Sequence, residues 1–176
     1  MKHFVITAFG EDKPGIVEKI TKVLYEKNLN IEDSSMTRLN NEFTVMLVVA
    51  SENDISEEDL KKEFEKVEKE LNLFINVKEI PEETIEGKKE VGEIYNLIVY
   101  GADKPGIVYK VSKLLADKNI NISDLRTEKS KDLYVMAIEA EVPKITNIED
   151  LEKDIEKLKD EMNIDISLEK VETVEM

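Results

Sequence analysis

The stretch GEDKPGIVEKITKVLYEKNLNIED at Gly10–Asp33 returns 91 residues later as GADKPGIVYKVSKLLADKNINISD at Gly101–Asp124. Fifteen of the 24 aligned positions are identical, and most of the others are conservative exchanges. The same offset continues without a gap as far as Ile75 and Ile166. A repeat of this kind indicates two copies of one structural unit. We therefore expect two modules, residues 1–80 and 93–176, joined by a polar linker at 81–92.

Both copies predict the same order of elements. A short apolar run precedes the repeated D-K-P-G loop, and an amphipathic helix follows it, with Pro at the first helical position. Two strand-like runs, a second helix and a last strand come next. The expected strands are His3–Phe9, Leu29–Arg38, Phe43–Ala50 and Leu73–Ile80, then Ile94–Tyr100, Ile120–Glu128, Leu133–Glu141 and Ile164–Val171.

The second helix of each copy is expected from an apolar stripe at steps of four, three and four. Because the stripe spans only about two heptads, it favours packing on a core over a coiled coil. The order βαββαβ predicts an α+β chain in which each module is a ferredoxin-like sandwich, an antiparallel four-stranded sheet with two helices on one face. The stripes are Leu60, Phe64, Val67 and Leu71, and Leu151, Ile155, Leu158 and Met162.

Composition excludes several classes of function. The 176 residues include no Cys and a single His, so thiolate metal sites, cysteine nucleophiles and His-ligated metals are not expected, and neither is a cofactor. The net charge of −15 disfavours direct contact with nucleic acid. No apolar run reaches the ~20 residues of a membrane helix, and no signal sequence is visible. We expect a cytoplasmic protein.

The repeated loop holds the residues that suit a ligand best. Gly15 and Gly106 are expected inside the first helical turn, where glycine costs about 1 kcal/mol relative to Ala. The gain would be close approach of an anion, such as an amino-acid carboxylate, to the N–H groups of the helix start. Asp12 and Asp103 would accept hydrogen bonds from the ammonium group. The alternative is that the two aspartates cap their helices.

At these residues the sequence resembles the ACT domain family. The resemblance rests on the βαββαβ order, D-x-P-G-I-V after the first strand and N-[IL]-N-I at the start of the second. It covers both halves of the chain outside the linker. ACT domains are small modules that bind amino acids and couple them to a partner domain or protein. Two modules with nothing else attached resemble the glycine cleavage system transcriptional repressor family.

In ACT domains the effector usually sits between two modules, against the first strand–helix loop and a residue that opens the second strand. The resemblance therefore implies that Asn30 and Asn121 contact the ligand together with the loops. A hydrogen-bonded turn into the strand is the alternative role for the two asparagines. The positions carried over are Asp12, Lys13, Gly15, Ile16, Asn30 and Ile31, and Asp103, Lys104, Gly106, Ile107, Asn121 and Ile122.

Two other functions fit the same βαββαβ order less well. An acylphosphatase-like enzyme needs an arginine at the loop and an asparagine that positions water, whereas Lys13 and Lys104 stand in the loop and we expect no arginine near it. An RNA-recognition module needs basic and aromatic strands. The composition lacks that signature, so we expect no catalysis and no catalytic residue.

The remaining rare residues are interpreted as structural. His3 is expected at the surface or at a sheet edge. Arg38 aligns with Lys129, and Arg126 aligns with Ser35, so the two arginines do not form a shared pair of catalytic residues. The tyrosines expected as packing residues are Tyr95, Tyr100, Tyr109 and Tyr134.

The expected function is therefore a sensor. It would bind a small amino acid, glycine or serine being our expectation, at interfaces between modules, and would form a homodimer. The partner would be a DNA-binding regulator or a metabolic enzyme, because the acidic chain is unsuited to DNA. The alternative is a protein-interaction or oligomerisation module that binds no ligand.

Overall fold

The computed structural model describes residues 1–81 and 92–171 of the chain. These residues form two compact units, here called module 1 and module 2. Except for its two end residues, the expected linker lies outside the described residues.

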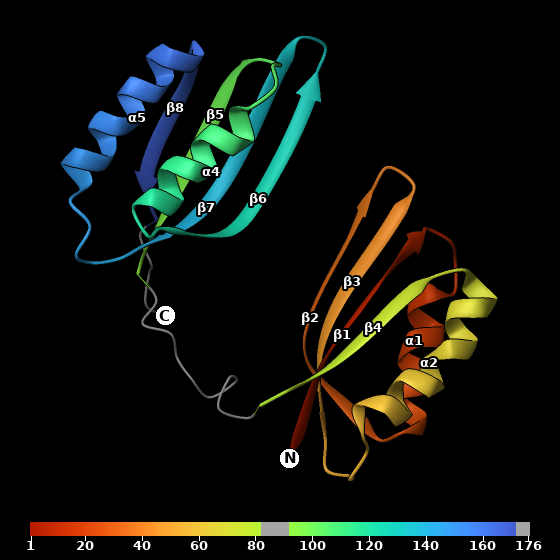
Figure 1. The fold of residues 1–176 in the computed structure, drawn as a ribbon. Coiled ribbons are helices and arrows are strands. Elements are labelled where there is room, and N and C mark those ends of the chain that lie inside the picture. The colour runs from red at the N-terminus through yellow and green to blue at the C-terminus, as the bar shows by residue number, and fades with distance from the viewer. Residues whose placement is uncertain (82–91, 172–176) are drawn as a thin grey trace. The chain divides into compact units, whose positions relative to one another are not determined.

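Module 1 has the order βαββαβ, as Figure 1 shows. Its helices lie between the first and second strands and between the third and fourth, as the sequence predicts. The elements are β1 (Lys2–Glu11), α1 (Ile16–Glu26), β2 (Leu29–Leu39), β3 (Glu42–Ser51), α2 (Glu57–Leu71) and β4 (Phe74–Ile80).

Module 2 repeats this order. Its strands and helices match their counterparts in length to within one residue, because the repeat contains no gap in them. The elements are β5 (Glu93–Ala102), α4 (Ile107–Asp117), β6 (Asn121–Ser130), β7 (Leu133–Val142), α5 (Ile148–Met162) and β8 (Ile164–Lys170).

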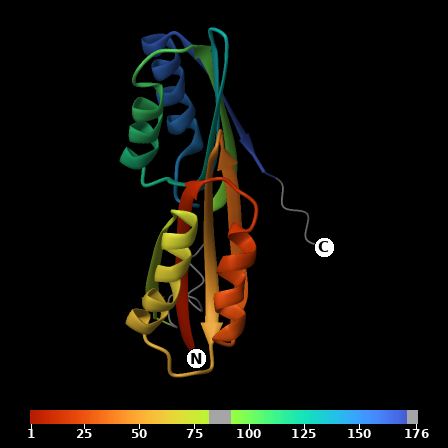
Figure 2. The ribbon, with the colours of Figure 1, turned by 90° about the vertical axis from the view of Figure 1, so that its right-hand side faces the viewer.

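Each module contains one antiparallel four-stranded sheet. The strand orders are β2-β3-β1-β4 and β6-β7-β5-β8, so the first strand of each module is central and the second is an edge. Both helices of a module lie on one face of its sheet, most plainly for α4 and α5 in Figure 2. The expected ferredoxin-like sandwich is confirmed in both modules.

Each core lies between the helices and one face of the sheet. The stripes of α2 and α5 are buried at all eight predicted positions. In module 1 the stripe of α2 packs against alternate residues of the central strand β1, such as Phe4 and Ile6, both fully buried. A strand's side chains alternate between its faces, so the residues between these point to the face without helices.

Asparagines end the helices in left-handed conformations. Asn28 and Asn119, after the first helices, have φ of 57° and 56°. Asn72 and Asn163 are left-handed C-caps of α2 and α5. Asparagine tolerates this region better than other residues with a Cβ atom, so these turns cost little.

The expected place of His3 is wrong. The side chain lies on the central strand β1 and is 5% exposed. Its Nε2 lies 3.5 Å from Glu32 Oε2. Its Nδ1 has no hydrogen-bond partner among the described residues.

Candidate ligand site

The two loops start their helices later than expected. Gly15 and Gly106 are not inside the first turn but are the N-caps of α1 and α4, both with φ of 96°. Pro14 therefore precedes the helix and is not its first residue. Since residues with a Cβ rarely adopt this φ, the backbone conformation explains the glycines. A Cβ added at either glycine would meet nothing within 4 Å, so each loop faces open space.

The first turns of α1 and α4 have no side-chain cap. Neither Asp12 nor Asp103 bonds to a helix N–H group, so the capping alternative is wrong. The second helices differ, because Ser56 and Asn147 cap α2 and α5 in the usual way. Uncapped N–H groups at the positive end of a helix are well placed to bind an anion.

Each loop aspartate instead pairs with a cation from the second strand of its own module. Asp12 Oδ2 lies 3.4 Å from a guanidinium nitrogen of Arg38, and Asp103 Oδ2 lies 2.5 Å from Lys129 Nζ. Arg38 and Lys129 occupy equivalent positions of the repeat. The expectation that no arginine lies near the loop is therefore wrong for module 1.

Sequence reasoning missed these cations because it compared arginine with arginine. The available signal was the repeat itself, which aligns a basic residue with a basic residue 26 positions after each loop aspartate. The alignment does not give the strand order. Because β3 pairs with both β1 and β2, it holds the end of β2 near the end of β1.

An open hollow of about 560 Å³ lies over the module 1 loop. The loop and the end of β2 form its walls. Beside it, a smaller and mainly apolar groove of about 250 Å³ runs between α1 and β2. The two share Val17 and Met36, so they form one continuous surface. The hollow is lined by Asp12, Lys13, Pro14, Gly15, Ile16, Val17, Glu18, Met36, Thr37, Arg38 and Phe43.

The predicted lysines and isoleucines have different positions. Lys13 lines the hollow, but Lys104 Nζ donates to the main-chain oxygen of Met162 at the end of α5. Ile16 and Ile107 are buried under the helix starts, so only their main-chain N–H groups are suited to a ligand. Ile31 lines the apolar groove, and its counterpart Ile122 packs against the core of module 2.

Asn30 does not share this hollow. It opens β2, whereas Arg38 is near the end of that strand. Their partners on β3, Ala50 and Phe43, are seven residues apart, which at ~3.3 Å per residue is about 23 Å. Asn30 lines another hollow, with Tyr25 and Glu52. Asn121, its counterpart, donates to Glu141 Oε2 at 3.3 Å. Within one module, the predicted loop and asparagine residues do not contact one ligand together.

Tyr134 adds a hydroxyl near the module 2 loop, where module 1 has Phe43. It is half-buried, and its strand position pairs with both Gly101 and Lys129. Burial, and then the charge of Asp103, raise the pKa of Tyr134. The sequence predicted only a packing role for this residue.

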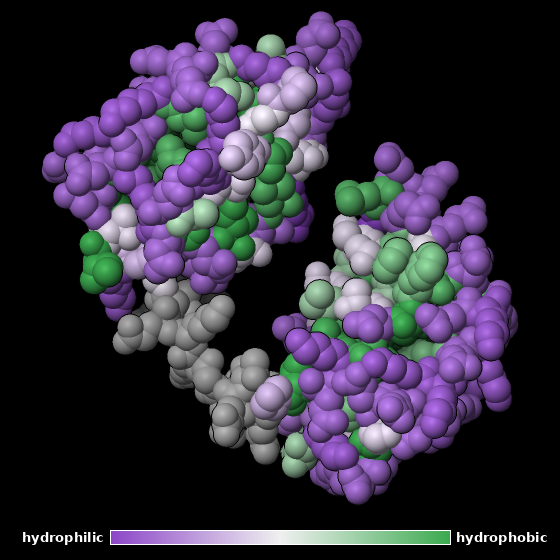
Figure 3. Space-filling view, in the orientation of Figure 1, coloured by the Kyte–Doolittle hydropathy of each residue, from purple (hydrophilic) through white to green (hydrophobic). Residues whose placement is uncertain are grey.

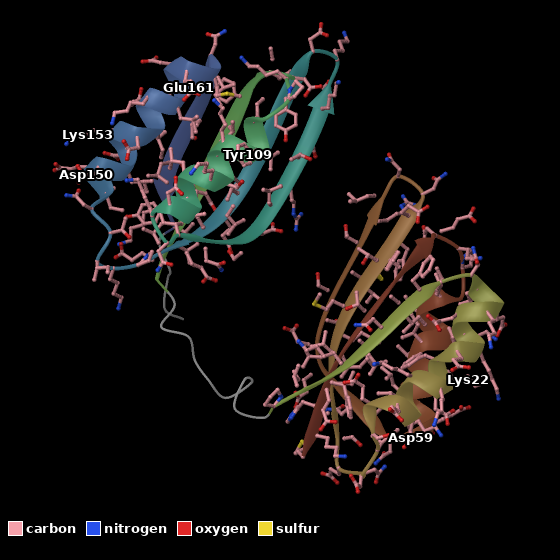
Figure 4. All side chains as sticks on the ribbon, viewed as in Figure 1. Lys22, Asp59, Tyr109, Asp150, Lys153 and Glu161 are labelled. Carbon is pink, nitrogen blue, oxygen red and sulfur yellow. The ribbon has the colours of Figure 1, made fainter. Side chains whose placement is uncertain are left out.

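The groove between α4 and α5 is occupied by ion pairs. Figure 4 shows Tyr109 and Glu161 on these two neighbouring helices. Lys110 pairs with Glu161, and Lys118 Nζ lies 2.8 Å from Asp154 Oδ2. Because Lys118 and Asp154 form a closer and less exposed pair than Arg38 and Asp12, this groove is a weaker ligand candidate than the hollow over the module 1 loop.

The described residues offer neither a metal site nor a membrane-spanning helix. No group of three or more His, Asp or Glu side chains there is placed to hold a metal ion. Within residues 1–81 and 92–171, no helix has both the length and the apolar content needed to cross a membrane.

The fold and the loop hollow define a tandem of two α+β modules with a charged site at the first strand–helix turn. Comparison with family models agrees: residues 2–78 and residues 95–161 each match an ACT domain. The chain therefore belongs to the ACT domain family and carries two ACT domains in tandem.

Two kinds of protein are among the curated relatives. A UPF0237 protein of Methanopyrus kandleri is 46% identical over 78 residues, which is 44% of this chain and 87% of the relative. The glycine cleavage system transcriptional repressor of Escherichia coli is 29% identical over 169 residues, covering 92% of this chain and 86% of the repressor. This chain is an ACT-domain protein related to both groups.

Solved structures agree with the fold over the full length. A protein of unknown function from Galdieria sulphuraria has a TM-score of 0.79 and 25% identity, with 97% of this chain and 99% of that chain covered. A putative glycine cleavage system transcriptional repressor has a TM-score of 0.70 and 21% identity, with 98% of each chain covered. The second similarity shows the fold alone.

Proposed function

We propose that this chain is a non-catalytic regulatory protein that binds a small amino acid at its ACT loops and transmits binding to a partner protein. The observation that carries the proposal is the hollow of module 1. It places a carboxylate, a guanidinium and an uncapped helix start side by side.

The charges of this hollow complement an amino-acid zwitterion. The ion pair between Asp12 and Arg38 is long, at 3.4 Å, and solvent-exposed, so it contributes little in the free protein. A ligand ammonium would pair with Asp12. The ligand carboxylate would bind Arg38 and the N–H groups of Ile16 and Val17, because a guanidinium forms bidentate hydrogen bonds to carboxylates.

The ligand side chain would point toward the apolar groove between α1 and β2. Glycine and serine are the ligands expected at the outset. The groove, lined by residues such as Ile20 and Ile31, has room for an aliphatic side chain as well. Thermal unfolding with a panel of amino acids, described below, distinguishes among these ligands.

A complete ACT-type site needs a second module. Asn30 lies about 23 Å along the strand from Arg38, at ~3.3 Å per residue, and Arg38 is the residue that meets the loop. An asparagine that contacts the ligand would therefore come from another module. Ligand binding would then favour one arrangement of modules, and this coupling would be the signal. A homodimer supplies the extra modules, and the cytoplasm remains the predicted location.

The partner would be a DNA-binding regulator or a metabolic enzyme. The repressor relative suggests transcriptional regulation of amino-acid metabolism. A net charge of −15 disfavours direct DNA contact, so a second protein would make it. An acylphosphatase-like reaction has less support, because the described residues that line the hollow include no asparagine that could position water.

The test is thermal unfolding of the full chain against the twenty amino acids at millimolar concentration. A ligand that binds only the folded state at 100 times its Kd adds about 2.7 kcal/mol. We expect one or two small amino acids to raise the midpoint. The double variant Asp12→Ala with Asp103→Ala should lose that shift, and Asp160→Ala, on an exposed position of α5, should keep it.

No shift with any amino acid, from a chain that unfolds cooperatively and reversibly, would contradict the sensor. The alternative, an interaction module without a ligand, would then be preferred. In that case the double aspartate variant should leave partner binding unchanged.

A further inference from the structure

The sheet of module 1 has one face without helices, here called the bare face. Its side chains belong to the strand positions between the core residues. Strand pairing arranges them in rows that cross the sheet from β2 through β3 and β1 to β4. The three central rows are Asp33–Val48–Val5–Lys78, Ser35–Met46–Thr7–Asn76 and Thr37–Thr44–Phe9–Phe74.

The apolar side chains of these rows stand among uncharged polar ones, and charges stand only at the two edges; the apolar members are Val5, Phe9, Met46, Val48 and Phe74. Phe9 and Met46 are each 51% exposed and Phe74 is 67% exposed. The rings of Phe9 and Phe74 stack with centroids 5.1 Å apart. Figure 3 shows green and pale residues gathered over the strands of module 1. Contiguous apolar surface with a polar rim is typical of a protein-binding face.

Module 2 has carboxylates at the equivalent positions. Its row corresponding to the charged row of module 1 is Asp124–Glu139–Asn96–Glu169. Phe74 is replaced by Asp165, whose pKa is lowered by hydrogen bonds from Tyr100 and Lys159. Burying such a face against an apolar one leaves carboxylates without water, which costs free energy. Module 2 is therefore a poor occupant for the bare face of module 1.

A second copy of the bare face is a complementary occupant. Along the row Asp33–Val48–Val5–Lys78 the charge is negative, neutral, neutral and positive. A two-fold axis parallel to the strands, between two stacked sheets, places β2 of one copy over β4 of the other. Asp33 then faces the partner's Lys78, and the symmetry forms this pair twice. The valines pack between the two pairs.

The available area is sufficient for a weak dimer. Four strands ~4.8 Å apart and about eight residues long at ~3.3 Å cover about 500 Å² per sheet, or about 1,000 Å² for two. That total is the lower limit for a specific interface. The next row, with Glu42 and Glu11, lies at the exposed end of the sheet, where the carboxylates keep their water.

We propose that the bare face of module 1 pairs with the same face of a second copy of this chain, about a two-fold axis parallel to the strands. The two sheets form an aligned sandwich with Asp33 over the partner's Lys78. This inference rests on the sheet face alone and does not depend on amino-acid binding.

The first test is sedimentation velocity of the full chain from about 5 to 500 μM with Val48→Glu. We expect the dissociation constant to rise at least tenfold, because a carboxylate then lies at the centre of the apolar face. Module 2 has Glu139 at this position, so the fold accommodates the substitution, and circular dichroism checks that it does. Lys22→Glu, on the exposed face of α1 (Figure 4), is the control with a charge change off the face.

The second test exchanges the charges of the row. Lys78→Glu and Asp33→Lys each change the net charge by two units, as Lys22→Glu does. Either single substitution places two like charges opposite one another in both symmetry-related pairs. It should therefore raise the dissociation constant of the dimer about tenfold at low salt, whereas Lys22→Glu should not. The double variant D33K with K78E should return it to within about threefold of wild type.

Several results would overturn the proposal. One is a chain that stays monomeric at 500 μM. A second is a dimer that Val48→Glu leaves intact. A third is a double exchange that fails to restore the dimer, because the pairing of the two sheet edges would then be wrong. Loss of amino-acid binding alone would leave the proposal standing, so its failure and that of the sensor are distinguishable.

Discussion

The two modules share a backbone and differ at two surfaces. At the loop, module 1 places a guanidinium 3.4 Å from its aspartate, and module 2 places an ammonium at 2.5 Å. On the face without helices, Val48 and Lys78 of module 1 correspond to Glu139 and Glu169 of module 2. Residues that the fold requires, such as the glycine with φ of 96°, are the same in both modules. The residues that differ are surface side chains that the fold does not constrain.

This difference suggests a division of roles. The guanidinium of Arg38, in a loose and exposed pair, can form two parallel hydrogen bonds to a ligand carboxylate. The ammonium of Lys129, closely paired with Asp103, is a single point charge. Under the two proposals, module 1 would be the ligand site and the docking face. Module 2, with its acidic face, would remain exposed to solvent.

The largest expected effect comes from breaking each core separately. Leu60→Ala and Leu151→Ala remove equivalent fully buried side chains and should each cost about 2–5 kcal/mol of unfolding free energy. Four of the five tyrosines are in module 2, so tyrosine fluorescence during urea unfolding reports mainly that module. Leu151→Ala should lower the fluorescence midpoint, and Leu60→Ala should leave it nearly unchanged. Equal shifts would mean that the modules unfold as one unit.

The next effect concerns the loop cations and rests on the proposed sensor function. Arg38→Ala should weaken binding of the amino acid that gives the largest thermal shift by about 10–100-fold, the loss of a charge-assisted hydrogen bond. Lys129→Ala, its matched control, should change the affinity less than about threefold. Isothermal titration calorimetry measures both. A larger loss in Lys129→Ala would assign the better site to module 2.

The glycines should show where the modules are alike. Gly15→Ala and Gly106→Ala each place a Cβ on a left-handed residue and should each cost about 1–2 kcal/mol by strain, since no atom obstructs the new group. Asn in place of either glycine should cost less. Chemical denaturation compares all four variants. A cost confined to one module would mean that the loops differ in more than their cations.

The smallest effect is an acid dependence particular to module 2. Hydrogen bonds from Lys118 and then Lys157 lower the pKa of Asp154 from 3.8 to about 2. Since the unfolded chain takes up this proton at higher pH, the stabilisation is complete above about pH 4 and is lost as the pH falls toward 2. Asp154→Asn should be less stable than wild type at pH 6. Circular dichroism during unfolding should find this difference gone near pH 2, and a difference that persists there would contradict the assignment.

Much of the fold was predictable because its signals are local. The buried stripe from Leu60 to Leu71 follows from helical spacing, and the left-handed Asn28 follows from the end of an apolar pattern. Errors of one or two residues arose at the loop, where Pro14 suggested an earlier helix start. A left-handed glycine before the helix has no periodic signal.

The candidate site was only partly predictable. The loop residues Asp12 and Gly15 follow from the repeated motif, and the structure places both at one hollow. The partner Arg38 was missed because it is 26 residues away and meets Asp12 only through strand order. Which loop Asn30 can approach was not predictable either, since its distance from the loop of its own module depends on the direction and length of β2.

The sequence by itself determined two ACT modules, their strands and helices and the residues of their cores, because hydrophobic periodicity and turn preferences act over a few neighbouring residues. Tertiary structure alone decided that Arg38 and Lys129 meet the loop aspartates, that His3 is buried, and that Asp33 and Lys78 end one row of an apolar face. These contacts join residues distant in the chain, and only the order and register of the strands bring them together.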